Sequence, residues 1–290
     1  MKPLVPSSVC AVVITYNPGE DLISNVQLLS PQVGHVVLVD NGSVGAAAAR
    51  ISEIEEQSSC SVIRNGRNLG IAAALNIGFR FAIDRHYEWI VTFDQDSTVT
   101  DGFILALLGT ADAASAPALI SPTYFDRQLK MELGVPTLAG GEPLTAMTSG
   151  SMLHRSTFLK AGPFDERLFI DQVDIEYCLR IRSMGMHIMR SERAVLLHSL
   201  GNISFRRVFG KRLVATNHSP ARRYYKTRNR LFLLFRYAHD WNWIRFDVRA
   251  TLAELLAILL IERQKLSKIR YMIRGAFDFT RGKWGPQVPL

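Results

Sequence analysis

The chain has 290 residues, of which 48% are hydrophobic and 21% are charged, and its formal net charge at pH 7 is +8. It is too apolar for a disordered protein, and its length suits one large α/β domain with an appended helical region. Its three cysteines, Cys10, Cys60 and Cys178, lie far apart without metal-ligand spacing, which excludes a disulfide framework and a zinc site and favours a reduced, cytosolic protein.

Strand-like and helical segments alternate through the first hundred residues. We predict strands at residues 9–15, 36–39, 61–63 and 89–93, with helices at 20–29, 46–57 and 71–83 between them. Four strands separated by helices favour a Rossmann-like, doubly wound, mostly parallel α/β sheet. Beyond them we predict a helix at 103–110, a strand at 119–121, and a hairpin or loop in the Gly- and Pro-rich stretch up to residue 150.

Three polar loops follow the first three predicted strands, and each precedes a helix. They contain Thr15 and Asn17, then Asp40 and Asn41, then Arg67, Asn68 and Gly70. Helix N-termini offer free N–H groups to phosphates, and an Asp at a strand end accepts hydrogen bonds from a base or a ribose. Each loop alone is more often a turn with a helix cap, but parallel strands bring all three into one crevice.

The fourth predicted strand ends in Asp94-Gln95-Asp96, at the edge where α/β folds place their ligand crevice. Two carboxylates this close repel each other unless a cation lies between them, and hard oxygen ligands suit Mg²⁺ or Mn²⁺ bridging a diphosphate. An isolated Asp-x-Asp is more often a solvated turn. Together with the three loops, Asp94, Gln95 and Asp96 predict a site for a nucleoside diphosphate and a metal ion.

A second acidic group lies at residues 169–180, which we predict to be a helix with an acidic first turn. Asp171 and Asp174 are three residues apart and are expected to share a face of that turn. Such carboxylates are commonly caps. The alternative is a general base that takes a proton from an attacking acceptor hydroxyl. His198 follows an apolar run at another strand end, where it either forms structural hydrogen bonds or reaches the metal or a phosphate.

These motifs resemble those of family 2 inverting glycosyltransferases of the GT-A fold. The resemblance is carried by Thr-Tyr-Asn, Val-Asp-Asn-Gly-Ser, Asn-Leu-Gly-Ile-Ala, Phe-Asp-Gln-Asp-Ser and Phe-Ile-Asp-Gln-Val-Asp-Ile-Glu-Tyr-Cys-Leu-Arg, in that order along the chain. Residues 94–97, 217–229 and 259–266 are similar to bacterial dTDP-L-rhamnose-dependent rhamnosyltransferases of the O-antigen, cell-wall and rhamnolipid types. Val173 is one departure, because some relatives have an acidic residue at that position.

The resemblance implies a role for several of these residues. It places Asp94 and Asp96 at the nucleotide and metal, Asp40 at the thymine or uracil ring, and His198 as a further metal ligand. It makes Asp174 the base, with Asp171 or Glu176 as alternatives. It implies a GT-A catalytic domain at residues 1–200, with a nucleotide-sugar half at about 1–98 and an acceptor half at about 99–200.

The function implied is transfer of L-rhamnose from dTDP-L-rhamnose to a hydroxyl of a glycolipid or of a polyprenyl-diphosphate-linked glycan. One alternative is a glycosyltransferase that uses another nucleotide sugar. An alternative of a different class is a non-catalytic nucleotide-sugar or nucleic-acid binding protein. The acidic pair, the base candidate and the histidine count against it, since a binder needs no carboxylate beside an anomeric carbon.

Charge distinguishes the C-terminal region, residues 201–290. Residues 1–198 contain 15 Lys and Arg against 21 Asp and Glu, a net of −6, whereas residues 199–290 contain 19 against 5, a net of +14. The bases include Arg222, Arg223, Lys226, Arg228 and Arg230. This excess, beside an apolar helix at 248–261, favours peripheral attachment to an anionic membrane, at the inner face of the bacterial cytoplasmic membrane.

The alternative for this region is a helical pair packed on the catalytic domain or on a partner in a homo-oligomer. Arginines interleaved with aromatic residues also occur in nucleic-acid binding proteins, but no recognised motif supports a nucleic-acid partner here. We expect no signal peptide, because residues 1–6 contain no apolar core of the length that a signal peptide needs. We also expect no membrane span, because the longest uncharged apolar run near the C-terminus, residues 255–261, is too short to cross a bilayer.

Overall fold

The computed structural model describes residues 4–57, 60–113, 118–127, 129–198, 203–208 and 211–289. It divides into two compact units. The first consists of Met1–Asp165 and Tyr177–Ser199, and the second of Glu166–Glu176 and Leu200–Leu290. The main division falls where the net charge of the sequence changes sign, and it assigns one short acidic segment to the second unit.

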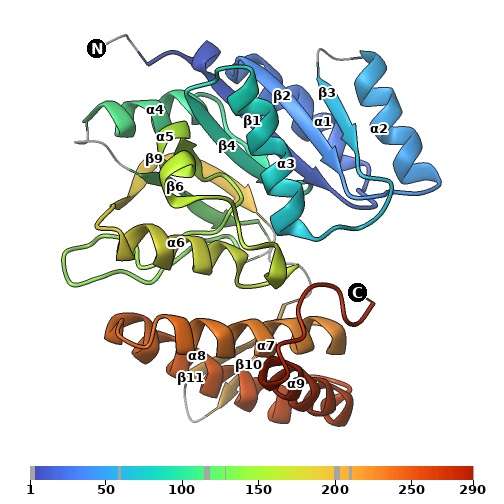
Figure 1. Cartoon of the computed structure of the whole chain (residues 1–290), viewed down its shortest axis with the longest axis vertical. Helices are drawn as coiled ribbons and strands as arrows, with labels where there is room; N and C mark the ends of the chain where they lie inside the picture. The colour runs from blue at the N-terminus through green and yellow to red at the C-terminus, as the bar shows by residue number, and fades with distance from the viewer. Residues whose placement is uncertain are drawn as a thin grey trace. The chain divides into compact units, whose positions relative to one another are not determined.

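The described part of the first unit is built on a nine-stranded sheet (Figure 1). Its strands are β1 (Val9–Thr15), β2 (His35–Asp40), β3 (Ser61–Arg64), β4 (Trp89–Asp94), β5 (Thr98–Val99), β6 (Leu119–Asp126), β7 (Met131–Leu133), β8 (Met152–His154) and β9 (Ile188–His198). Their order is β3-β2-β1-β4-β8-β6-β9-β5, and β7 pairs with β6. Strands β3, β2, β1 and β4 are parallel, which confirms the predicted doubly wound α/β arrangement.

Helices connect these strands. They are α1 (Asp21–Leu29), α2 (Ala46–Gln57), α3 (Ile71–Asp84), α4 (Phe103–Ala113), α5 (Arg155–Ala161) and α6 (Val173–Ser183), with short 3₁₀ turns at Pro6–Ser8, Ser30–Gln32 and Glu166–Leu168. All seven residues of β1 are buried, as expected for a β-branched strand covered on both faces. Helix α3 approaches β1 closely at Gly78, where a Cβ atom would lie 2.2 Å from Cγ1 of Val12.

The second half of the sheet is mixed, and the sequence patterns did not predict all of it. Strand β8 is antiparallel to both β4 and β6, whereas β6 and β9 are parallel. Strand β5 pairs antiparallel with β9, so that Thr98 lies opposite Leu197. Strands β6 and β7 form an antiparallel hairpin within the segment predicted to be a hairpin or loop.

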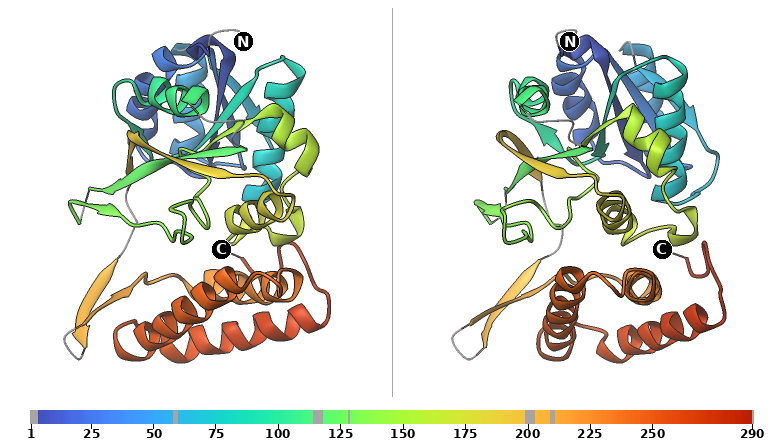
Figure 2. Two further views of the ribbon diagram at one scale, coloured as in Figure 1. Left: turned by 90° about the vertical axis from the view of Figure 1, so that its left-hand side faces the viewer. Right: turned by 60° about the vertical axis from the view of Figure 1, so that its left-hand side comes forward.

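Among the described residues from 203 onward, the second unit contains three helices and a hairpin, which Figure 2 shows from two sides. They are β10 (Ser204–Val208), β11 (Lys211–Ala215), α7 (Pro220–Arg236), α8 (Trp241–Leu260) and α9 (Lys265–Thr280). Ser219 caps α7 by accepting a hydrogen bond from the Arg222 N–H, and α7 packs along α9. Among the described residues, no helix is long and apolar enough to cross a membrane.

Three of the bases of α7 to which membrane attachment was ascribed, Arg223, Arg228 and Arg230, are buried, so their side chains are not available to a membrane surface. Arg223 pairs with Glu254 and with Glu262, the latter at 2.6 Å. Arg230 pairs with Asp247 at 2.9 Å, and Arg228 donates to backbone carbonyls. These side chains hold the helices of the second unit together.

Candidate active site

The loops after β1, β2 and β3 meet at Asn41, which is buried. Its backbone N–H donates to the Thr15 carbonyl oxygen at 2.8 Å, and its Nδ2 donates to the Gly70 carbonyl oxygen at 3.2 Å. Its Oδ1 accepts from Nδ2 of Asn65 at 2.9 Å. Through its backbone and its side chain, this one residue therefore joins the three loops that were predicted to share one crevice.

Asp40 and Asn17 form hydrogen bonds that hold the loops at the same edge of the sheet. The buried Asp40 carboxylate accepts from the Thr15 hydroxyl at 3.3 Å and from the N–H and hydroxyl of Ser43. Asn17, with a φ of +48°, accepts from the Val44 N–H at 3.0 Å and donates its own N–H to Oγ of Ser43. The Asp40–Ser43 contact is a local Asx-type interaction, and the other bonds join the β1 loop to the β2 loop, so that together they fix the loop conformation.

The contact between the β2 and β3 loops requires glycine at position 42. Gly42 has a φ of +89°, and a Cβ atom there would lie 2.6 Å from Cα of Arg67. We expect Gly42→Ala to lower the free energy of unfolding by about 1–3 kcal/mol more than Gly66→Ala does. Gly66 is the matched control, because its φ is +69° but nothing lies within 4 Å of its Cβ position. Equal losses in urea denaturation of the two variants would contradict the close approach.

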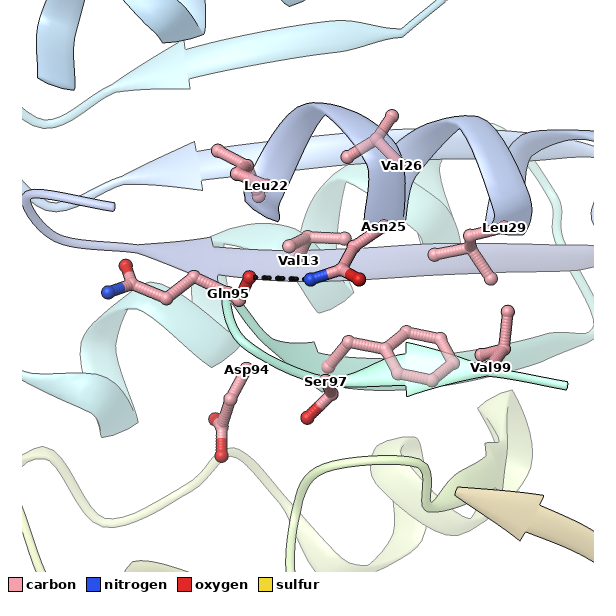
Figure 3. Close-up of a pocket in the computed structure, with 10 residues that line it drawn as sticks. Val13, Leu22, Asn25, Val26, Leu29, Asp94, Gln95, Ser97 and Val99 are labelled. Atoms are coloured by element: carbon pink, nitrogen blue, oxygen red, sulfur yellow. Dashed lines mark hydrogen bonds between the residues drawn. The ribbon is translucent and has the colours of Figure 1, made fainter. Parts of the chain in front are cut away.

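The acidic pair lies at the end of β4, where Asp94 is the last residue of the strand and is half-buried, and Asp96 follows it and is exposed. Gln95 attaches this turn to its neighbours: its Oε1 accepts from the Tyr16 N–H at 2.8 Å, and its carbonyl oxygen accepts from Asn25. In Figure 3 the Asp94 carboxylate points away from α1. The small pocket between α1 and this turn is lined mostly by apolar side chains, among them Val13, Leu22, Val26, Leu29, Phe93 and Val99.

The strand register brings Asp96 and His198 to one end of the β5–β9 pair. Thr98, two residues after Asp96, lies opposite Leu197, the residue before His198. The side chain of His198 lies outside the described residues. Among the residues that are described, no group of three or more His, Cys, Asp and Glu could hold a metal. The two carboxylates nevertheless fit Mg²⁺ or Mn²⁺, which take carboxylate oxygens and complete their shell with diphosphate oxygens and water.

The segment before α6 is a loop, so the prediction that Asp171 and Asp174 share the first turn of a helix is wrong. Helix α6 begins at Val173, and three residues before it have positive φ: Phe169 at +65°, Asp171 at +61° and Gln172 at +66°. Non-glycine residues adopt this region at a cost of the order of 1–2 kcal/mol each. Surrounding contacts must therefore hold the loop.

The three candidates for the base differ in their surroundings. Arg222 binds Asp171 through two nitrogens, at 2.6 and 3.3 Å. Burial alone would raise the pKa of Asp171, but nearby positive charge, chiefly the Arg222 guanidinium, holds that pKa below its usual range. Glu176 is buried and accepts from the Tyr237 hydroxyl at 2.8 Å. Asp174 is half-buried in the first turn of α6, where its Oδ1 accepts from the Ile175 N–H.

Asn229 and Arg228, which the sequence reasoning gave no structural role, hold the strained loop. Nδ2 of Asn229 lies 2.8, 2.8 and 2.9 Å from the carbonyl oxygens of Leu168, Ile170 and Asp171. Arg228 donates to the Leu168 carbonyl oxygen at 3.1 Å. One feature of the sequence could have indicated this role: Arg228 and Asn229 follow Tyr224 and Tyr225 by one helical turn, which places the two polar residues on the same inward face of α7.

Replacing Asn229 should release this loop. Asn229→Leu keeps the volume but leaves carbonyl oxygens unsatisfied, at about 1–3 kcal/mol for each group that stays buried. We expect amide hydrogens of residues 169–172 to exchange faster, while those of α9 keep their protection. Asn242→Leu, at an exposed position of α8, is the control and should change neither. Unchanged exchange in the loop of Asn229→Leu would contradict this role.

Solved structures show the fold class. The described fold is similar to that of S. aureus TarS 1–349 in complex with UDP-GlcNAc, with a TM-score of 0.66 over 95% of this chain and 81% of that one at 13% identity. It is also similar to GalNAc-T7 with UDP, GalNAc and Mn²⁺, with a TM-score of 0.55 over 70% of this chain and 44% of that one at 14% identity. The fold is GT-A-like, as predicted.

Sequence comparison shows the family. Residues 10–137 match the model of glycosyl transferase family 2. The chain is 32% identical to the dTDP-rhamnosyl transferase RfbF of Shigella flexneri, over 96% of this chain and 97% of that protein. It therefore belongs to family 2 and is a glycosyltransferase. It is also 26% identical to the galactofuranosyltransferase GlfT1 of Mycobacterium tuberculosis, over 82% of this chain and 87% of that protein.

Proposed function

We propose that this glycosyltransferase moves L-rhamnose from dTDP-L-rhamnose to an acceptor hydroxyl with inversion at the anomeric carbon. The observation that supports this donor is the 32% identity to a dTDP-rhamnosyl transferase along almost the whole chain. The joined loops at the edge of the parallel sheet support a nucleotide-sugar donor, because this is where α/β folds bind nucleotides.

The proposed donor site uses the loops that Asn41 joins. Asp40 accepts a hydrogen bond from the base, and the exposed Arg67 faces the diphosphate as a charged donor. Gly70 is the N-cap of α3, where free N–H groups favour phosphate oxygens. The remaining residues of the proposed site are Thr15, Asn17, Asn41, Asn68, Asp94 and Gln95.

The proposed metal ligands are Asp94, Asp96 and His198, for Mg²⁺ or Mn²⁺. When bound, the ion neutralises negative charge on the departing diphosphate. Support comes from the donor chemistry of the two carboxylates and from the register that brings Asp96 and His198 to one end of the β5–β9 pair. Gln95 keeps the turn that carries both carboxylates in place through its bond to the Tyr16 N–H.

Asp174 is the proposed general base, which takes the proton of the acceptor hydroxyl as that oxygen attacks. Asp171 is less suited, because its carboxylate forms an ion pair with Arg222 and its pKa is lowered. Glu176 is less suited as well, because it is buried against Tyr237. Asp174 keeps a partly exposed carboxylate at the start of α6.

The proposed acceptor is a glycolipid or a polyprenyl-diphosphate-linked glycan at the inner face of the cytoplasmic membrane. The net charge of +14 on residues 199–290 supports an anionic, membrane-bound acceptor.

A donor panel tests the proposed function without knowledge of the acceptor. Purified protein with Mn²⁺ is incubated with dTDP-L-rhamnose, dTDP-glucose, UDP-galactofuranose or UDP-GlcNAc, and release of the nucleoside diphosphate is followed. Since the site should activate its own donor, we expect hydrolysis of dTDP-L-rhamnose at a rate at least about tenfold above the others, a difference of about 1.4 kcal/mol in barrier height. Preference for UDP-galactofuranose would replace the proposed donor, and hydrolysis of none would overturn the proposal.

A further inference from the structure

Helix α8 has an apolar outward face, although it also buries Trp243, Ala257 and Ile258 on its inward side. Its inward face carries the carboxylates of Asp247 and Glu254, which pair with bases of α7. Its outward face carries five large apolar residues, each between 46% and 71% exposed: Trp241, Val248, Leu252, Leu256 and Leu259. A helix of a globular protein normally turns its apolar side chains toward the core.

The exposed residues form one continuous stripe. At 100° per residue, positions 241, 248, 252, 256 and 259 fall within an arc of about 80°, and 1.5 Å per residue gives the stripe a length of about 27 Å. Helix α9 repeats the spacing with Leu266, Ile273 and Phe277, of which Leu266 is 85% exposed. Contiguous exposed apolar surface of this kind marks an interaction site.

The exposed charges next to these stripes are basic. Arg245 lies within the arc of the α8 stripe and Arg249 at its border, and both are exposed. Arg263, Lys265 and Arg270 are exposed further along the chain. The five acidic residues of 200–290 do not offset them at the surface, since Asp240 caps α8 and the other four form ion pairs with neighbouring bases.

We propose that the outward face of α8, formed by Trp241, Val248, Leu252, Leu256, Leu259, Arg245 and Arg249, binds the surface of an anionic lipid bilayer. The apolar side chains enter the boundary between head groups and acyl chains, and the arginines contact phosphate groups. The helix lies in the plane of the membrane. The inference deepens the proposed function, on which it rests for the membrane-bound acceptor.

Charge favours a bilayer over a second copy of this chain as the occupant of this face. A two-fold dimer presents the same surface from both copies, so it would bring Arg245 and Arg249 into the field of the partner's identical arginines. Like charges facing each other across an interface oppose association. An anionic bilayer supplies the complementary charge and removes the apolar stripe from water at the same time.

Cosedimentation of the full chain with lipid vesicles tests the proposal. We expect binding to phosphatidylcholine vesicles that contain phosphatidylglycerol, weaker binding to pure phosphatidylcholine, and release by salt, because surface charges are screened within about 10 Å at 0.1 M ionic strength. Arg245→Gln with Arg249→Gln should weaken binding to the anionic vesicles roughly 25-fold. Leu252→Gln with Leu256→Gln should weaken binding to both kinds of vesicle.

The matched control is Leu105→Gln with Leu159→Gln, which removes two exposed leucines of the first unit and should bind like wild type. Absence of binding to anionic vesicles, or binding that neither α8 variant weakens, would overturn the proposal. A dimer in sedimentation velocity that the leucine variant dissociates would also overturn it, because a second copy would then cover the face.

Hydrolysis of dTDP-L-rhamnose without vesicles separates the two proposals. The α8 variants should hydrolyse the donor at the wild-type rate, since their substitutions lie outside the proposed donor site. Vesicle binding without hydrolysis of dTDP-L-rhamnose would overturn the proposed donor and leave the membrane face standing. Hydrolysis of dTDP-L-rhamnose without vesicle binding would overturn the membrane face and leave the proposed donor standing.

Discussion

Asp174→Asn is expected to lower the rate of glycosyl transfer by about 10²–10⁴-fold, the usual effect of removing a general base. The asparagine side chain has nearly the same shape but cannot accept the proton of the attacking hydroxyl. Because Asp174 makes no proposed contact with the nucleotide, the Kd for dTDP should stay within about twofold of wild type. Donor turnover and isothermal titration with dTDP measure the two quantities separately.

Asp171→Asn and Glu176→Gln are the controls for this assignment. Asp171→Asn removes the charge that pairs with Arg222, so it should lower stability and reduce turnover less than Asp174→Asn does, at equal folded fraction. The Glu176→Gln side chain can still accept a hydrogen bond from the Tyr237 hydroxyl, so this variant should reduce turnover least of the three. A near-normal rate for Asp174→Asn together with a large loss in either control would assign the base to that other residue.

Asp96→Asn is expected to remove the dependence of dTDP binding on metal. A bound ion stabilises developing charge by several kcal/mol, and each 1.4 kcal/mol is tenfold in rate, so turnover should fall at least about 10²-fold. Wild-type protein should bind dTDP more tightly with Mn²⁺ than with a chelator, whereas Asp96→Asn should bind it equally in both. Isothermal titration under the two conditions makes the comparison.

Asp101→Asn is the matched control for Asp96→Asn, because Asp101 is also an exposed carboxylate in a turn, the one that follows β5. It should keep both the metal dependence and the turnover of wild type. If the wild-type affinity for dTDP is indifferent to chelator and Asp96→Asn remains active, the metal assignment fails.

The parallel half of the sheet was predictable from local sequence because it forms from long β-branched runs. Strand β1 was predicted with its observed bounds, and β2 extends its prediction by one residue at each end. Strands β5 and β8 were missed because they have two and three residues, too few for an alternating pattern to show. Their pairing depends on neighbours far away in the sequence, β9 for β5 and β4 and β6 for β8.

The donor loops were predictable and the acidic loop was not. Asn41 and Gly42 lie in a turn motif whose place after a strand fixes their location. The left-handed conformation of Asp171 has no signal in its residue type, and it is held by Asn229, 58 positions away. The net charge of the C-terminal region follows from counting its residues, but the count does not predict which of the charged side chains are buried. Arg223 and Arg230 are buried because Asp247, Glu254 and Glu262 neutralise them.

The central claim is inverting transfer of rhamnose from dTDP-L-rhamnose, and proton NMR of the first turnovers tests it most directly. Protein at high concentration is mixed with dTDP-L-rhamnose and Mn²⁺, and the anomeric signal of the released sugar is recorded before it equilibrates. We predict that dTDP is released together with L-rhamnose of the anomeric configuration opposite to that of the donor. Rhamnose released with the configuration of the donor, or no release of dTDP, would contradict the account.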